Sequence, residues 1–118
     1  MARPLLFAYG TLQEARQRDA VLRGAATREI GRGSVAGTLY DLGEYPGLVA
    51  DGAARVPGTL IELPDEAALA LLDAYEGVDE GLYARVRATV RLETGDELEA
   101  WLYSYLRPVD GRPRIASW

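Results

Sequence analysis

One glutamate of the chain is placed where a carboxyl group can do acid–base chemistry. Glu76 follows Leu69 by seven residues and Leu72 by four, so a helix through this stretch carries Glu76 onto its apolar face. Gly77 is a natural helix end, which places Glu76 in the last turn beside unpaired carbonyl groups. Burial and the negative potential of those carbonyls both raise the pKa of a carboxyl. Either Glu76 exchanges protons near neutral pH, or the helix end frays and Glu76 points to water.

A second stretch offers hydrogen-bond donors. The apolar run at residues 5–9 predicts a strand buried on both faces, and residues 10–12 lead from it into a polar segment with helical potential. A strand that turns through glycine into a helix start leaves backbone N–H groups unpaired in one place, which suits a carboxylate or a developing oxyanion. The triplet Gly-Thr-Leu recurs at Gly37 and Gly58 inside strand-like runs, where glycine indicates a barrel bend or close packing.

The residue types that are missing narrow the chemistry. The chain has no Cys and no His, and all 13 of its basic side chains are Arg. Thiolate nucleophiles, Cys or His metal sites, Schiff bases and a Walker-type phosphate lysine are therefore excluded. Proton transfer falls to Asp, Glu, Tyr or the substrate, and we expect neither a metal nor a cofactor. The net charge of −5, without a basic run, argues against nucleic acid as a partner.

The composition predicts one globular domain over residues 1–118. Its hydrophobic share of 48% and charged share of 26% are typical of such proteins. No apolar run approaches the roughly 20 residues needed to span a bilayer, and charged residues soon follow the short apolar run near the N-terminus. We therefore expect a cytoplasmic protein that does not contact membranes.

The elements that must position Glu76 and residues 10–12 alternate between strand and helix patterns. Strands are predicted at residues 34–42, 55–63, 86–92 and 98–106, and helices at 13–24 and from 65 to the glycine at 77. The last strand is apolar on both faces and should be central, whereas residues 107–118 should be irregular. Tyr45 and Pro46 are predicted in a turn rather than a substrate wall, and Arg16 and Arg18 as solvated helix charges. These elements predict an α+β fold, a small mixed, mostly antiparallel β-barrel of about five to six strands with two helices.

Three motifs in this order resemble the gamma-glutamylcyclotransferase-like family, in particular its short bacterial members close to the gamma-glutamylamine cyclotransferase type. They are Phe-Ala-Tyr-Gly-Thr-Leu at 7–12, Leu-Tyr-Asp-Leu-Gly at 39–43 with Tyr-Pro-Gly at 45–47, and Leu-Asp-Ala-Tyr-Glu-Gly at 72–77 followed by Tyr83 and Arg85. The resemblance covers nearly the whole chain. It departs at residues 115–118, Ile-Ala-Ser-Trp, where related chains often end in Gly-Asp-Trp.

The resemblance implies cyclisation of a gamma-glutamyl group, in which the free α-amine of a small-molecule substrate attacks the γ-carbonyl and releases 5-oxoproline and an amine. The family's catalytic Glu corresponds to Glu76, which would act as general acid and base without a metal. The implied substrate-binding residues are Tyr9, Gly10, Thr11, Leu12 and Tyr83. The alternative is that Tyr83 is a packing residue of the barrel, since most tyrosines at strand starts are structural.

Three functions remain open from the sequence. The first is a cyclotransferase acting on a gamma-glutamyl amine or amide. The second is an enzyme that removes a gamma-glutamyl protecting group from a larger biosynthetic intermediate, and the third is a non-catalytic module that binds a small molecule. A narrow cavity suits the first and an open cleft the second. The sequence fixes neither the leaving amine nor the oligomeric state.

Overall fold

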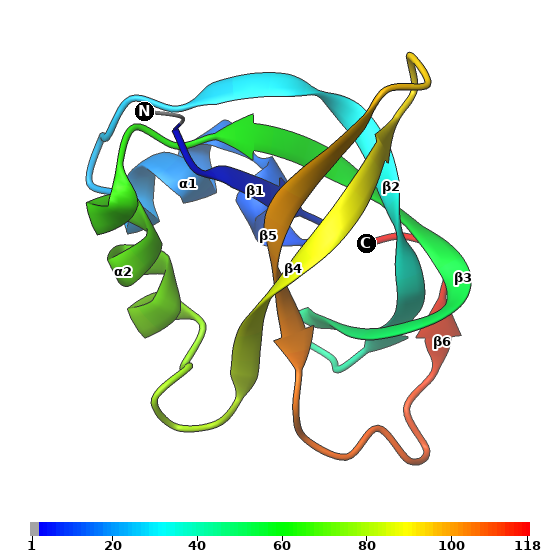
Figure 1. Cartoon of the computed structure of the whole chain (residues 1–118). Coiled ribbons are helices and arrows are strands. Elements are labelled where there is room, and N and C mark those ends of the chain that lie inside the picture. Colours follow the sequence, from blue (N-terminus) through cyan, green and yellow to red (C-terminus); the bar gives the residue numbers. More distant parts are fainter. Residues whose placement is uncertain (1–2) are drawn as a thin grey trace.

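The computed structural model describes residues 3–118, apart from the side chains at positions 52 and 53. Six strands, two α-helices and a short 3-10 helix make up the described chain (Figure 1). In chain order they are β1 Leu5–Ala8, the 3-10 helix η1 Thr11–Gln13, α1 Ala15–Val21, β2 Arg28–Asp41, β3 Pro46–Glu62, α2 Glu66–Tyr75, β4 Tyr83–Leu92, β5 Glu97–Tyr105 and β6 Arg114–Ile115.

Five of the strands close into a barrel in the order β1-β3-β2-β4-β5, with β5 returning to β1. All neighbours are antiparallel except β5 and β1, which meet in parallel at Leu6 and Trp101. The predicted α+β class and the mixed, mostly antiparallel barrel are confirmed. Figure 1 shows the β4–β5 hairpin crossing the front of the barrel, with α2 beside it. No helix of residues 3–118 is long and apolar enough to span a membrane.

Several element boundaries differ from the sequence prediction. β3 begins at Pro46 and continues through the Asp51-Gly52 pair, since β2 and β3 pair along most of their length with a register shift after Gly37. The strand predicted at residues 55–63 therefore begins earlier in the chain than the sequence indicated. The tail is not wholly irregular either, because β6 pairs with β2 at Leu39 and Tyr40.

Strand β1 joins two hydrophobic clusters because its side chains alternate between them. Leu6 and Ala8 belong to a cluster that packs the helices against the barrel wall, with Leu69 and Leu72 of α2. Phe7 and Tyr9 point the other way, into the cluster that fills the barrel. The prediction that this strand is buried on both faces is confirmed. As a result, β1 delivers the segment at residues 10–12 from a rigid support.

Close backbone packing explains two strand glycines. A Cβ built on Gly58 would lie 2.4 Å from the Ala8 carbonyl oxygen and 2.6 Å from the Phe7 ring. A Cβ on Gly37 would lie 2.9 Å from the Val49 carbonyl oxygen. These distances are too short for a side chain, so the prediction of close packing is confirmed at these positions.

We expect Gly58→Ala to destabilise the protein by about 1–3 kcal/mol, because the added methyl group must displace β1 or the Phe7 ring. Gly31→Ala is the matched control, since a Cβ there meets only a Leu92 methyl group at 3.9 Å. Urea unfolding of both variants and the wild type measures the difference. Equal stabilities of the two variants would contradict the packing argument.

Candidate active site

Helix α2 is built to end at Glu76. Asp65 caps its start, where the side-chain oxygen accepts a hydrogen bond from the Ala68 amide at 3.0 Å. Glu76 is the last residue with helical dihedral angles, and its amide donates to the Leu72 carbonyl at 2.9 Å. Gly77 then takes a φ of +67°, which ends the helix. Glu76 is therefore held in an ordered turn rather than at a frayed end.

The side chain of Glu76 lines a cavity of about 290 Å³. This cavity brings together every site residue that the sequence indicated, and its walls come from five separate parts of the chain. Its walls are formed by Leu6, Phe7, Ala8, Tyr9, Gly10, Thr11, Leu12, Tyr45, Pro46, Tyr75, Glu76, Leu82, Tyr83 and Tyr103. Most of these side chains are apolar or aromatic, and Glu76 is the one charged residue among them.

Burial in this cavity raises the pKa of Glu76 to about 7, from the usual 4.5. Within residues 3–118, no side-chain hydrogen bond or ion pair compensates the carboxylate. Protonated and ionised forms are therefore both populated near neutral pH, which is the condition for a group that accepts and returns a proton.

The turn after β1 supplies unpaired donors to the cavity wall. The carbonyl groups of Gly10 and Thr11 accept hydrogen bonds from Gln13 and Glu14 at 3.1 Å each. By contrast, the amides of residues 10–12 donate to no backbone or side-chain acceptor within the described chain. Their N–H groups can therefore bind a carboxylate or an oxyanion.

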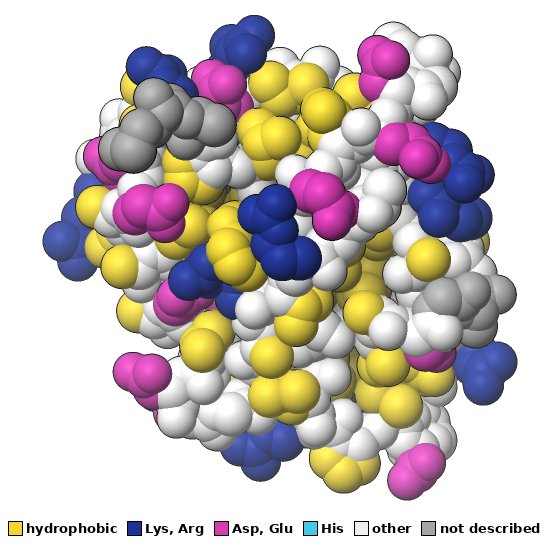
Figure 2. Space-filling view, in the orientation of Figure 1, with side chains coloured by type: hydrophobic (Ala, Val, Ile, Leu, Met, Phe, Trp, Pro, Cys, Tyr) yellow, Lys and Arg dark blue, Asp and Glu magenta, His cyan; other side chains and the backbone are white. Residues whose placement is uncertain are grey.

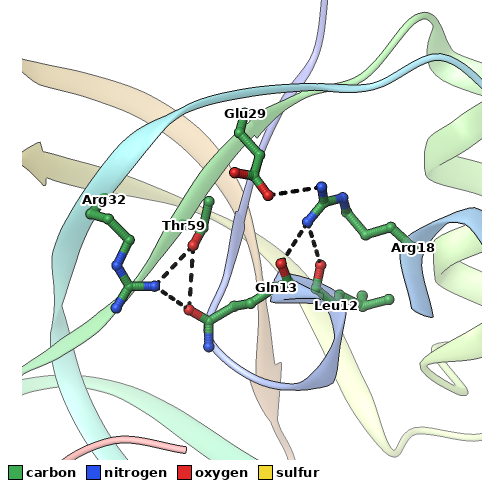
Figure 3. Close-up of polar contacts among 6 residues, drawn as sticks. All are labelled: Leu12, Gln13, Arg18, Glu29, Arg32 and Thr59. Atoms are coloured by element: carbon green, nitrogen blue, oxygen red, sulfur yellow. Dashed lines mark hydrogen bonds and ion pairs between the residues drawn. The ribbon is translucent and has the colours of Figure 1, made fainter. Parts of the chain in front are cut away.

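Arg18 holds this turn in place by binding backbone carbonyl groups at its end (Figure 3). One terminal nitrogen of its guanidinium donates to the carbonyl groups of Leu12 and Gln13, at 3.1 and 2.8 Å, and the other pairs with Glu29 at 3.0 Å. Arg18 is only 4% exposed, so its prediction as a solvated helix charge is wrong, whereas Arg16 is exposed as predicted. Pairing and hydrogen bonding of its two terminal nitrogens compensate the burial of the charge, whereas Nε is buried without a partner in the described chain.

Two tyrosines of the cavity have hydroxyl groups bound to backbone. Tyr9 donates to the Tyr103 carbonyl at 2.6 Å and accepts from the Leu48 amide at 3.3 Å. Tyr83 donates to the Pro46 carbonyl at 2.7 Å. Burial raises the pKa of both hydroxyl groups, so they stay neutral donors. Tyr83 is thus a packing residue as well as a cavity wall, and its substrate-binding role stays a prediction.

Tyr45 and Pro46 form part of the wall and not only a turn. The turn itself lies at residues 42–45, where the Leu42 amide donates to the Tyr45 carbonyl, and Pro46 begins β3. Pro46 faces Gly10 so closely that a Cβ on Gly10 would lie 2.9 Å from its ring. Tyr45 therefore lies in a turn as predicted, whereas Pro46 belongs to a strand, and both residues also line the cavity.

A network of polar contacts that was not predicted from the sequence holds α2 against the barrel. The Arg85 guanidinium forms two hydrogen bonds with Asp73, at 2.8 and 3.3 Å, and the Tyr103 hydroxyl donates to the same carboxylate at 2.8 Å. Arg85 also lies over the Trp101 ring, 4.3 Å from its centroid. Because Asp73 is one helical turn before Glu76, this network fixes the end of α2. In the sequence, Asp73 stands out as a polar residue beside the apolar face of the helix. Nothing in the sequence indicates that Arg85 is its partner.

Charged groups elsewhere on the surface are mixed. Figure 2 shows acidic and basic side chains interspersed with hydrophobic ones on the face that carries the β4–β5 hairpin. In the part of the chain that the structure describes, no three carboxylates are grouped closely enough to hold a metal ion. The carboxyl groups at residues 73–80 are therefore not gathered into one metal site.

Residues 6–118 match the sequence model of a family described as gamma-glutamyl cyclotransferase, AIG2-like. The chain is 43% identical over 79 residues to the gamma-glutamylcyclotransferase family protein YtfP of Escherichia coli K12, a match that spans 67% of this chain and 63% of that protein. It is 35% identical to the corresponding protein of Citrobacter rodentium over 113 residues, which are 95% of this chain and 90% of the relative.

Solved structures share the fold. The crystal structure of a mouse AIG2-like protein aligns with a TM-score of 0.84 and 25% identity, and the alignment covers 100% of this chain and 89% of the mouse chain. A structure named gamma-glutamyl cyclotransferase aligns with a TM-score of 0.75 at 15% identity, over 94% of this chain and 69% of the other. These alignments support the barrel and the position of its two helices.

The raised pKa of Glu76 makes a prediction for stability. Between about pH 4.5 and 7, the folded protein binds more protons than the unfolded chain, so its free energy of unfolding falls as the pH rises through this range. Glu76→Gln is neutral at every pH and avoids this loss. We therefore expect its stability advantage over the wild type to grow from pH 4.5 to 7 and then to level off.

Urea unfolding across this pH range measures the effect. Glu44→Gln, which removes an exposed carboxyl in the turn before β3, is the control and should show no such pH-dependent advantage. A constant difference between Glu76→Gln and the wild type at all pH values would contradict the raised pKa.

Proposed function

The chain belongs to the gamma-glutamyl cyclotransferase, AIG2-like family, and on this basis we propose that it converts a gamma-glutamyl amine or amide to 5-oxoproline and a free amine. The observation that carries the proposal is Glu76, an unpaired carboxyl with a pKa of about 7 in a cavity lined by free backbone amides. The substrate brings its own nucleophile, so a protein without Cys, His and Lys has the groups that the reaction needs.

In the proposed reaction, the α-amine nitrogen of the substrate bonds to its own γ-carbonyl carbon. The Glu76 carboxylate accepts a proton from the attacking nitrogen, and the resulting carboxylic acid returns it to the leaving nitrogen as the γ-amide C–N bond breaks. A pKa of about 7 suits both steps because neither protonation state is strongly preferred at neutral pH. Closing a five-membered ring also makes positioning a large part of the rate enhancement.

The amides of residues 10–12 would stabilise the negative charge that the reaction handles. They have no acceptor within the described chain, and Arg18 fixes the carbonyl groups of the same turn. Donors held in place before the reaction need no rearrangement as charge develops on the γ-carbonyl oxygen. The same amides can alternatively bind the α-carboxylate of the glutamyl group.

The aromatic wall would exclude water and contact the glutamyl methylene groups. Tyr9 and Tyr83 present their rings to the cavity while their hydroxyl groups hold the backbone at Leu48 and Pro46. An apolar wall lowers the local dielectric constant, which raises the pKa of Glu76 and strengthens the hydrogen bonds of the amides.

The size of the cavity favours a small substrate over a large biosynthetic conjugate. Its volume of about 290 Å³ is at the low end of the range for small-molecule sites. A non-catalytic binding module is disfavoured by Glu76 itself, because an unpaired carboxyl in an apolar cavity costs stability without a binding partner.

Glu76→Gln keeps the shape of the side chain and removes its proton chemistry. We expect turnover to fall by about 10²–10⁴-fold while substrate binding is retained, since general acid–base groups contribute that much. Release of 5-oxoproline from a panel of gamma-glutamyl amines, followed by mass spectrometry, measures turnover, and calorimetry measures binding. A variant that keeps more than about a tenth of wild-type turnover at saturating substrate would exclude Glu76 as the acid–base group.

A substrate with a blocked amine tests the mechanism separately from the residue. An N-acetylated gamma-glutamyl compound cannot cyclise, because its nitrogen is no longer a nucleophile. We expect 5-oxoproline from the free amine and no cleavage of the acetylated compound, with products identified by mass spectrometry. Release of N-acetylglutamate would instead indicate a hydrolase that activates water.

A further inference from the structure

A second hollow borders the turn that lines the Glu76 cavity. Its volume is about 430 Å³, and Gly10 and Thr11 belong to the walls of both spaces. The remaining walls combine polar and aromatic groups from η1, β2, β3 and the C-terminal segment. Among these are Gln13, Glu14, Arg32 and Trp118.

Arg32 is held by one end of its guanidinium (Figure 3). A single terminal nitrogen, Nη1, donates to the Gln13 side-chain oxygen at 2.6 Å and to the Thr59 hydroxyl at 3.0 Å. The Thr59 hydroxyl in turn donates to Gln13 at 3.3 Å, so the three side chains hold one another. This arrangement uses both N–H groups of Nη1 and fixes the plane of the guanidinium.

The other edge of the same guanidinium is unused. Within residues 3–118, Nε and Nη2 of Arg32 have no hydrogen-bond or ion-pair partner. The parallel N–H groups on this edge match the two oxygens of a carboxylate, which is the strongest geometry for such a pair. Because the Arg32 side chain is exposed and already oriented, a ligand loses little in ordering it.

We propose that this hollow receives the leaving portion of the substrate and that Arg32 selects leaving groups that carry a carboxylate. The inference rests on the proposed function. If the γ-carbonyl group binds at the amides of residues 10–12, the leaving amine starts beside Gly10 and Thr11, which also border the hollow. The Trp118 ring supplies a flat apolar wall for the connecting carbon atoms.

Glu14 lines the same hollow and, unlike Arg32, disfavours a leaving group that carries a carboxylate. Its carboxylate repels an anionic leaving group, so only a group that reaches Arg32 gains from its charge. A purely structural role for Arg32, holding Gln13 and the turn, would affect acidic and neutral substrates alike. The ratio of activities on the two kinds of substrate therefore separates recognition from support.

The experiment compares matched pairs of gamma-glutamyl conjugates. Each pair joins the glutamyl group either to an ω-amino acid or to the n-alkylamine of the same chain length, and kcat/KM is measured from 5-oxoproline release. At the chain length that reaches Arg32, we expect the wild type to prefer the acidic partner by about tenfold or more. This preference should decrease as salt is added.

Variants assign the preference to a residue. Arg32→Gln should bring the ratio close to one, and Arg32→Lys should keep part of it. Glu14→Gln should raise the ratio. Arg28→Gln is the control, because it removes the same charge from the same strand and Arg28, which pairs with Glu62, lines neither space.

The outcomes are distinguishable from a failure of the proposed function. Equal kcat/KM values for acidic and neutral substrates at every length, or an acid preference unchanged in Arg32→Gln, would overturn this inference and leave the cyclotransferase proposal intact. Absence of 5-oxoproline from every conjugate would overturn both.

Discussion

Burial of one carboxyl without a partner is the constraint around which the structure is arranged. The apolar cavity that raises the pKa of Glu76 also disfavours its folded, ionised form, so neighbouring contacts must hold the residue in place. The Asp65 cap fixes the start of α2, and the pairing of Asp73 with Arg85 and Tyr103 fixes the turn before Glu76. Stability gained at these polar contacts offsets what the carboxyl costs.

Two arginines contact the turn after β1 in different ways. Arg18 is buried and binds the carbonyl groups of Leu12 and Gln13, which leaves the amide side of the turn free for a ligand. Arg32 is exposed and binds the Gln13 side chain, with one edge of its guanidinium unused. The contacts of Arg18 fix the geometry of the turn, whereas the unused edge of Arg32 can act on the choice of substrate. Both arginines nevertheless contact the same few residues.

Local sequence patterns predicted those elements whose structure depends on interactions between residues close in sequence. The apolar run of β1 and the apolar face with a glycine end in α2 both predicted their elements, and the ordered motifs predicted the fold. Contacts between distant residues were not predictable in the same way. Arg18 looks like a surface residue of a polar helix because its acceptors are backbone carbonyl groups, which carry no sequence signal. Likewise, nothing local to Pro46 indicates that Gly10 lies against it.

The closure of the barrel also sets the order in which the site can be assembled. Strand β1 is among the first segments of the chain, yet its neighbours are β3 and, through Leu6 and Trp101, β5. Such pairings must bring together residues far apart in sequence, and contacts of this kind form slowly during folding. While the chain is being synthesised, β1 therefore lacks one of its two neighbouring strands until β5 has left the ribosome. Because Tyr103 of β5 also lines the cavity, the cavity is complete only when the barrel has closed. A nascent chain that ends before β5 therefore lacks a complete site.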